Sequence, residues 1–154
     1  LLRYVFMAQS AQFYLLHDMA SPNGLSAQEQ LACNLAAAAW RLGKRVLISC
    51  ETQEQALLLD EALWQRDPDE FVPHNLFGEI TTYATPIEIS WSSKRNAQRR
   101  DLLINLQQVL PEFFGTFNQI IDFVPAEEQA KKLARERYKF LRTQGWQLST
   151  ENAA

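Results

Sequence analysis

The chain has 154 residues, a length typical of one domain with one hydrophobic core. Hydrophobic residues make up 47% and charged residues 21%, which are the values of a folded domain and not of a disordered chain. No stretch approaches the roughly 20 consecutive apolar residues of a membrane span, so we expect no membrane partner. Fifteen basic and eighteen acidic residues give a net charge of -3, which argues against binding nucleic acid over the whole surface.

The two cysteines, Cys33 and Cys50, lie in apolar sequence and lack CxxC spacing, which predicts two reduced thiols in a cytoplasmic protein. The residues before Met7 make a poor signal peptide because they contain an arginine and no small-residue cleavage site. The predicted organisation is a non-native or disordered extension at 1–6, one domain at 7–148 and a C-terminal tail at 149–154.

The first half of the chain predicts alternating strands and helices. The apolar and aromatic run at 12–16 is typical of a strand, and a turn follows it. Ser26 and Glu29 have the spacing of a capping box, which starts a helix over about 27–42. The nearly continuous apolar run at 45–50 predicts a strand buried on both faces.

The second half continues the pattern. Thr52 is expected to cap a helix that ends at Trp64, and residues 71–85 are expected to form a loop. Strands at 87–91, 101–106 and 119–124, a short helix after Pro111 and a last helix over 126–143 complete the prediction. Together the elements indicate a three-layer, Rossmann-like α/β domain with a mostly parallel central sheet.

The sequence lacks a phosphate-binding loop. The first strand-to-helix turn contains a single glycine, Gly24. Because neither a G-x-G-x-x-G motif nor a P-loop occurs, we expect no cofactor. His17 and His74 are the only histidines and have no zinc-site spacing, so no metal is expected. An α/β enzyme with His17, Asp18 and Cys50 at the strand ends remains an alternative, although no complete catalytic set can be named.

The last predicted helix is strongly basic. Residues 131–142 contain six basic residues and one acidic residue, a local charge of +5. At 100° per residue, Lys131, Arg135, Tyr138 and Arg142 fall on one stripe. Such a stripe suits an acidic peptide or a carboxylate, and the alternative is a solvated basic face. Three apolar residues of this helix are expected to pack on the sheet: Leu133, Phe140 and Leu141.

Two further features have open interpretations. Trp64 at a helix end and Phe71 on the following loop are either core residues or anchors for a protein partner. The basic cluster at 94–100 is a candidate for weak binding of single-stranded DNA, although it contains no aromatic residue for base stacking.

Eight stretches in chain order resemble the chi subunit family of bacterial DNA polymerase III. They span about residues 12–148, and LDEALW, FVPHN and LARERYK form the most specific combination. The stretches are FYLL (13–16), GLSAQEQLAC (24–33), GKRVLISCE (43–51), LDEALW (59–64), FVPHNL (71–76), RRDLLINL (99–106), IDFVP (121–125) and KKLARERYK (131–139).

The resemblance implies a non-catalytic adaptor in DNA replication with a Rossmann-like fold. Such a protein forms a heterodimer with the psi subunit of the clamp loader. It also binds the acidic C-terminal tail of single-stranded DNA-binding protein (SSB), so that it contacts DNA only indirectly. The implied location is the replisome in the bacterial cytoplasm.

The resemblance also assigns residues. Lys131 and Arg135 match family positions that bind the SSB tail, and Val124, Tyr138 and Lys139 are nearby candidates by placement. Trp64 and Phe71 match the family surface for psi, which a helicase-like partner is expected to share.

Overall fold

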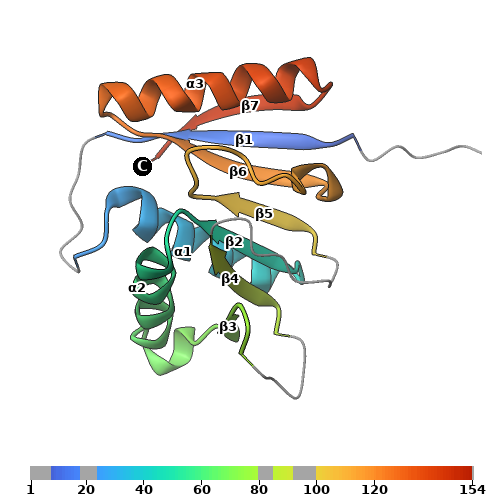
Figure 1. Cartoon of the computed structure of the whole chain (residues 1–154). Helices are drawn as coiled ribbons and strands as arrows, with labels where there is room; N and C mark the ends of the chain where they lie inside the picture. The colour runs from blue at the N-terminus through green and yellow to red at the C-terminus, as the bar shows by residue number, and fades with distance from the viewer. Residues whose placement is uncertain (1–7, 18–23, 80–84, 92–99, 154) are drawn as a thin grey trace, which may run out of the picture.

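All neighbouring strands in the described part of the chain run parallel, and they form one seven-stranded sheet (Figure 1). The structure, a computed structural model, describes residues 8–17, 24–79, 85–91 and 100–153. Across the sheet the strands are β3 (His74–Leu76), β4 (Ile87–Trp91), β2 (Val46–Cys50), β5 (Leu102–Asn105), β6 (Gln119–Val124), β1 (Ser10–Leu15) and β7 (Gln147–Asn152).

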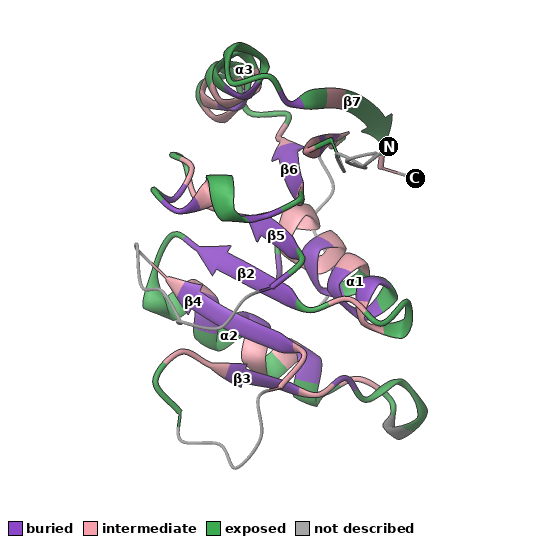
Figure 2. Ribbon diagram, turned by 90° about the vertical axis from the view of Figure 1, so that its right-hand side faces the viewer, coloured by how far each residue is buried: buried purple, intermediate pink, exposed green. Residues whose placement is uncertain are grey.

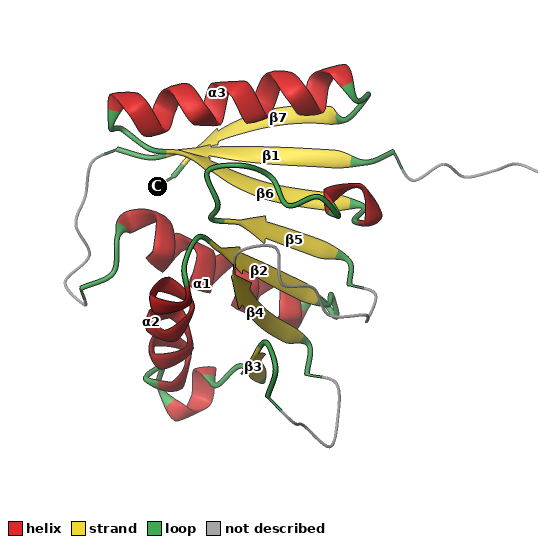
Figure 3. Cartoon of the chain, viewed as in Figure 1, coloured by secondary structure: helices red, strands yellow, loops and turns green. Residues whose placement is uncertain are grey.

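Helices cover both faces of the sheet and create three layers (Figure 3). The connections from β1 to β2 and from β6 to β7 cross the sheet in opposite directions. Since parallel crossovers are right-handed, their helices lie on opposite faces. The helical elements are α1 (Ala27–Arg41), α2 (Gln53–Trp64), η1 (Pro68–Glu70), η2 (Phe114–Thr116) and α3 (Glu128–Thr143).

The alternation of side chains along the central strands divides the core into two clusters. In β2, Val46 and Ile48 belong to the cluster that contains residues of α1 and α2, whereas Leu47 belongs to the cluster on the other face, with Phe117 and Leu141. Figure 2 shows the central strands as mostly buried, whereas β7 at the edge is largely exposed. The predicted α/β fold with a parallel sheet is therefore confirmed.

The predicted capping box is present. The Ser26 hydroxyl accepts a hydrogen bond from the Glu29 backbone N–H at 3.1 Å, and the Ser26 N–H donates to Glu29 Oε1 at 2.9 Å. Thr52 caps α2 in a similar way by accepting from the Gln55 N–H at 3.1 Å. These local bonds form between residues three apart, which is why the sequence pattern predicted them.

Two strands were not predicted. β3 lies within the segment expected to be a loop, and residues 149–152 of the expected tail belong to β7. Both strands are at the sheet edges, and β7 has the polar sequence QLSTEN without apolar alternation. β3 forms by pairing with β4, and β7 forms by pairing with β1. Because both depend on tertiary pairing, the local sequence does not predict them. The short helix expected after Pro111 is the 3-10 turn η2, and residues 1–6 lie outside the described residues.

Candidate functional site

A pocket of about 430 Å³ opens at the carboxyl ends of β1 and β6, beside α3. These two strands are neighbours, and the helices that follow them pack on opposite faces of the sheet. Open α/β sheets bind their ligands at such points. The pocket is lined by Leu15, Leu16, His17, Val124, Pro125, Ala126, Lys131, Ala134, Arg135, Tyr138 and Thr150.

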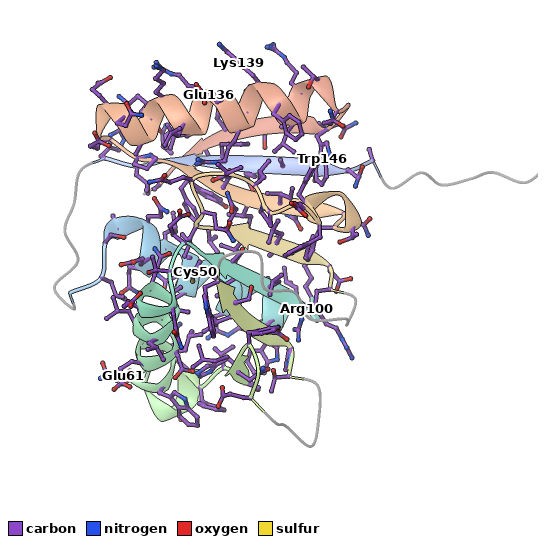
Figure 4. All side chains as sticks on the ribbon, viewed as in Figure 1. Cys50, Glu61, Arg100, Glu136, Lys139 and Trp146 are labelled. Carbon is purple, nitrogen blue, oxygen red and sulfur yellow. The ribbon has the colours of Figure 1, made fainter. Side chains whose placement is uncertain are left out.

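Four of the five residues predicted for the tail site meet in this pocket. Lys131, Arg135 and Tyr138 come from one side of α3, and Val124 comes from the end of β6. Lys139 does not line the pocket, because it follows Tyr138 by one residue and the helix turns by 100° over that step. It is exposed on the side of α3 away from the sheet (Figure 4).

The pocket combines an apolar floor with cationic walls. The Tyr138 ring packs edge-on against the buried Phe13 ring, with centroids 5.2 Å apart, so its position is fixed. Lys131 has only a weak neighbour, an exposed Glu128 carboxylate at 3.7 Å. Within the part of the chain that the structure describes, no salt bridge occupies Arg135 and no carboxylate lines the pocket. The geometry therefore suits an anionic ligand with an apolar portion.

One basic residue of α3 has a structural role that the sequence analysis missed. Arg137 forms a salt bridge with Asp122 of β6, and its Nη1 donates to the Gln108 carbonyl at 2.8 Å. Burial raises the pKa of Asp122, and the charge of Arg137 opposes that shift. A charged residue inside the apolar strand QIIDFV was the available sequence signal for a buried partner. Arg137 holds α3 on the sheet and is not free for a ligand.

The apolar residues of α3 divide differently from the prediction. Leu141 is fully buried, as expected, and Ala134 is buried beside it. Phe140 is 43% exposed, and its ring contacts Phe114 of η2 with centroids 5.3 Å apart. Leu133 is half-buried beside Phe140 in a second groove, because the side of α3 opposite the pocket meets the η2 loop and not the sheet.

The aromatic pair at the end of α2 forms a separate surface. Trp64 is 59% exposed and Phe71 is 42% exposed, and their ring centroids lie 5.3 Å apart. Both rings pack on His74, whose Nδ1 lies 2.7 Å from the Val72 carbonyl and whose Nε2 lies 3.2 Å from Asp60 Oδ1. The two aromatic rings are therefore not core residues but an exposed surface on a buried polar support.

The residues considered for the alternative interpretation as an α/β enzyme are less well placed for catalysis. Cys50 is buried at the end of β2, and burial raises the pKa of its thiol, which disfavours the nucleophilic thiolate. His17 lines the pocket, while Asp18 lies outside the described residues. No group of three metal-binding side chains occurs among the described residues.

The prediction that the basic cluster at 94–100 contacts single-stranded DNA is wrong for Arg100. Arg100 is buried and binds Glu88 at 3.2 Å together with the carbonyls of Thr85 and Pro86, both at 2.9 Å. Its guanidinium group is thus part of the fold and not of a DNA-binding loop. Residues 94–99 lie outside the described residues.

Fold and pocket together define an α/β domain with a cationic, apolar binding site at its strand ends and without a glycine-rich phosphate loop. The sequence profile described as "DNA polymerase III chi subunit, HolC" matches residues 7–149. The chain therefore belongs to the DNA polymerase III chi subunit family, whose place is in DNA replication.

Individual relatives agree with this assignment. The chain is 65% identical to DNA polymerase III subunit chi of Haemophilus influenzae over 95% of this chain and 99% of that protein. It is 51% identical to the Escherichia coli subunit chi over 92% of this chain and 97% of that protein. The identity to the Pseudomonas aeruginosa subunit chi is 35%, over 80% of this chain and 84% of that protein.

A solved structure shares the fold alone. The crystal structure of T4 UvsW aligns with a TM-score of 0.63 at 9% identity, over 95% of this chain. The chain spans 41% of the length of that protein. Among the described residues, none of the helices combines the length and apolar character needed to cross a membrane.

Proposed function

We propose that this chi-family chain is a non-catalytic adaptor that joins the psi subunit of the clamp loader to the C-terminal tail of SSB in the bacterial cytoplasm. The observation that carries the proposal is the pocket beside α3, where Lys131, Arg135, Tyr138 and Val124 surround an apolar floor. An arginine side chain forks onto carboxylate oxygens, and an apolar floor accepts a terminal aromatic side chain. The tail of SSB offers both chemistries, and DNA is reached through SSB.

The psi subunit is assigned to the surface of Trp64 and Phe71. Exposed, rigid aromatic residues are the side chains that contribute most to protein interfaces. This surface borders β3, the first strand across the sheet, whereas the pocket lies at β6 and β1, the fifth and sixth. The separation of the two surfaces supports simultaneous binding of both partners. A helicase-like partner that uses Trp64 and Phe71 would compete with psi.

Paired variants test the proposal. Purified psi subunit and a fluorescent SSB tail peptide are titrated into the wild type, Arg135→Ala and Phe71→Ala. We expect Arg135→Ala to lose the peptide and keep psi, and Phe71→Ala to lose psi and keep the peptide. Undiminished peptide binding by Arg135→Ala would refute the pocket assignment. Loss of both partners in one variant, with an unchanged circular dichroism spectrum, would refute the assignment of two separate surfaces.

A further inference from the structure

We propose that His17 is a third cationic group of the pocket beside α3, so that the affinity for an acidic ligand increases as the pH falls from 8 to 6. The inference rests on the proposed function for the identity of the ligand. It adds a residue that the tail assignment does not include and a dependence on protonation.

The position of His17 is set by the end of β1. The Leu16 N–H donates to the Val124 carbonyl at 3.0 Å, and the Leu15 carbonyl accepts from the Ala153 N–H at 3.0 Å. The backbone is thus held to β6 on one side and to the end of β7 on the other. The next residue, His17, is exposed and lines the pocket.

The charged groups around the pocket determine whether the affinity for an acidic ligand rises or falls with pH. Lys131, Arg135 and Tyr138 line it from α3, Thr150 lines it from β7, and none of the lining residues is acidic. Several acidic residues lie close to the lining residues in the sequence. Asp18 lies outside the described residues, and four others do not line the pocket: Glu127, Glu128 (3.7 Å from Lys131), Glu136 and Glu151. Among the described residues that line the pocket, the charged neighbours of His17 are thus cationic, and the ligand brings carboxylates to the imidazole.

Linkage then predicts the direction of the effect. A neighbouring carboxylate favours the protonated form of an imidazole, so binding of an acidic ligand takes up a proton at His17. A histidine ordinarily titrates near pH 6.5, whereas lysine, arginine and carboxylate groups titrate outside the range from pH 6 to 8. An exposed ion pair changes the dissociation constant about two- to fivefold, which is the expected effect of the pH change.

The test uses a fluorescent acidic hexapeptide that ends in phenylalanine with a free carboxylate. Its dissociation constant is measured at pH 6, 7 and 8 for the wild type and for His17→Gln. We expect the wild type to bind about two- to fivefold more tightly at pH 6 than at pH 8, and His17→Gln to show a flat profile. The only other histidine, His74, is buried near Asp60 and remains in both proteins, so the difference between the profiles isolates His17.

The two ways of failing are distinct. Equal pH profiles in the two proteins, with the peptide bound, would refute the role of His17 and leave the pocket assignment intact. Absence of peptide binding by the wild type at every pH would refute the pocket assignment and the inference together. The imidazole proton signals of His17 provide a second readout, since peptide addition at pH 7 should shift them toward the protonated form.

Discussion

Arg137 of α3 holds Asp122 of β6 through two hydrogen bonds: Nε donates to Oδ2 at 2.8 Å, and Nη2 donates to Oδ1 at 3.1 Å. Asp122 is fully buried, and the Asn105 amide and the Phe123 N–H also donate to it, at 3.4 and 2.7 Å. The pair lies on the opposite side of α3 from the stripe that lines the pocket. It therefore fixes the orientation in which α3 presents Arg135.

Replacing Arg137 by methionine should strongly destabilise the fold. The substitution leaves the Asp122 carboxylate buried without its counter-charge, which costs about 3–5 kcal/mol. Urea unfolding followed by tryptophan fluorescence measures the change. Lys132→Met on the exposed side of α3 is the control and should change stability by less than about 0.5 kcal/mol. The double variant Arg137→Met, Asp122→Leu should recover part of the loss, and a single-variant cost below about 1 kcal/mol would contradict the role.

Phe71 and Phe13 should respond differently to truncation. Phe13 is completely buried against Tyr138, and Phe13→Ala should cost about 3–5 kcal/mol because it creates a cavity. Phe71 is 42% exposed and loses mainly its ring contacts with Trp64 and His74, so Phe71→Ala should cost at most about 1.5 kcal/mol. Thermal unfolding compares the two variants. Equal losses would mean that Phe71 is a core residue and not part of an interaction surface.

The two cysteines should be unreactive in the native protein. Burial raises the pKa of Cys33 from 9.0 to about 12 and also raises that of Cys50. Iodoacetamide should therefore label neither thiol at pH 8 in buffer and both in guanidinium chloride. Because the native state retains thiol protons that the unfolded state releases, the free energy of unfolding should fall as the pH rises above about 9. Rapid labelling of the native protein at pH 8 would contradict this environment.

The start of α3 should respond to acid. The Glu127 carboxylate accepts hydrogen bonds from the N–H groups of Gln129 and Ala130 at 3.0 and 2.8 Å, and these bonds lower its pKa. A lowered pKa contributes stability above the ordinary glutamate value, and this contribution disappears as the pH falls through the lowered value. The stability difference between the wild type and Glu127→Ala should therefore shrink on acidification. Chemical unfolding at pH 7 and pH 3 measures it, and a constant difference would exclude the charged cap.

The features that sequence alone predicted are those fixed by local spacing. The bonds between Ser26 and Glu29 join residues three apart, and the helical period of 3.6 places Lys131, Arg135 and Tyr138 on one side. A short polar edge strand such as β7 has no such local signal and forms only by pairing with β1.

The remaining parts of the site depend on contacts between distant segments. Leu15 of β1 pairs with Val124 of β6, so residues more than a hundred positions apart form the same pocket. The sequence pattern contained no information on that register, and His17 was considered only as a catalytic candidate. The Arg137–Asp122 pair is equally non-local, because its members lie on a helix and a strand that meet only after folding.

Titration of the acidic, phenylalanine-ending peptide into the wild type and Arg135→Ala most directly tests the claim that the pocket beside α3 binds an anionic tail. A hydrogen bond to a charged group is worth about 1.5–3 kcal/mol, so Arg135→Ala should weaken binding about 10- to 100-fold. Lys132→Ala, which removes an exposed charge of α3 that does not line the pocket, should stay within about twofold of the wild type. Equal affinities of Arg135→Ala and the wild type would contradict the account.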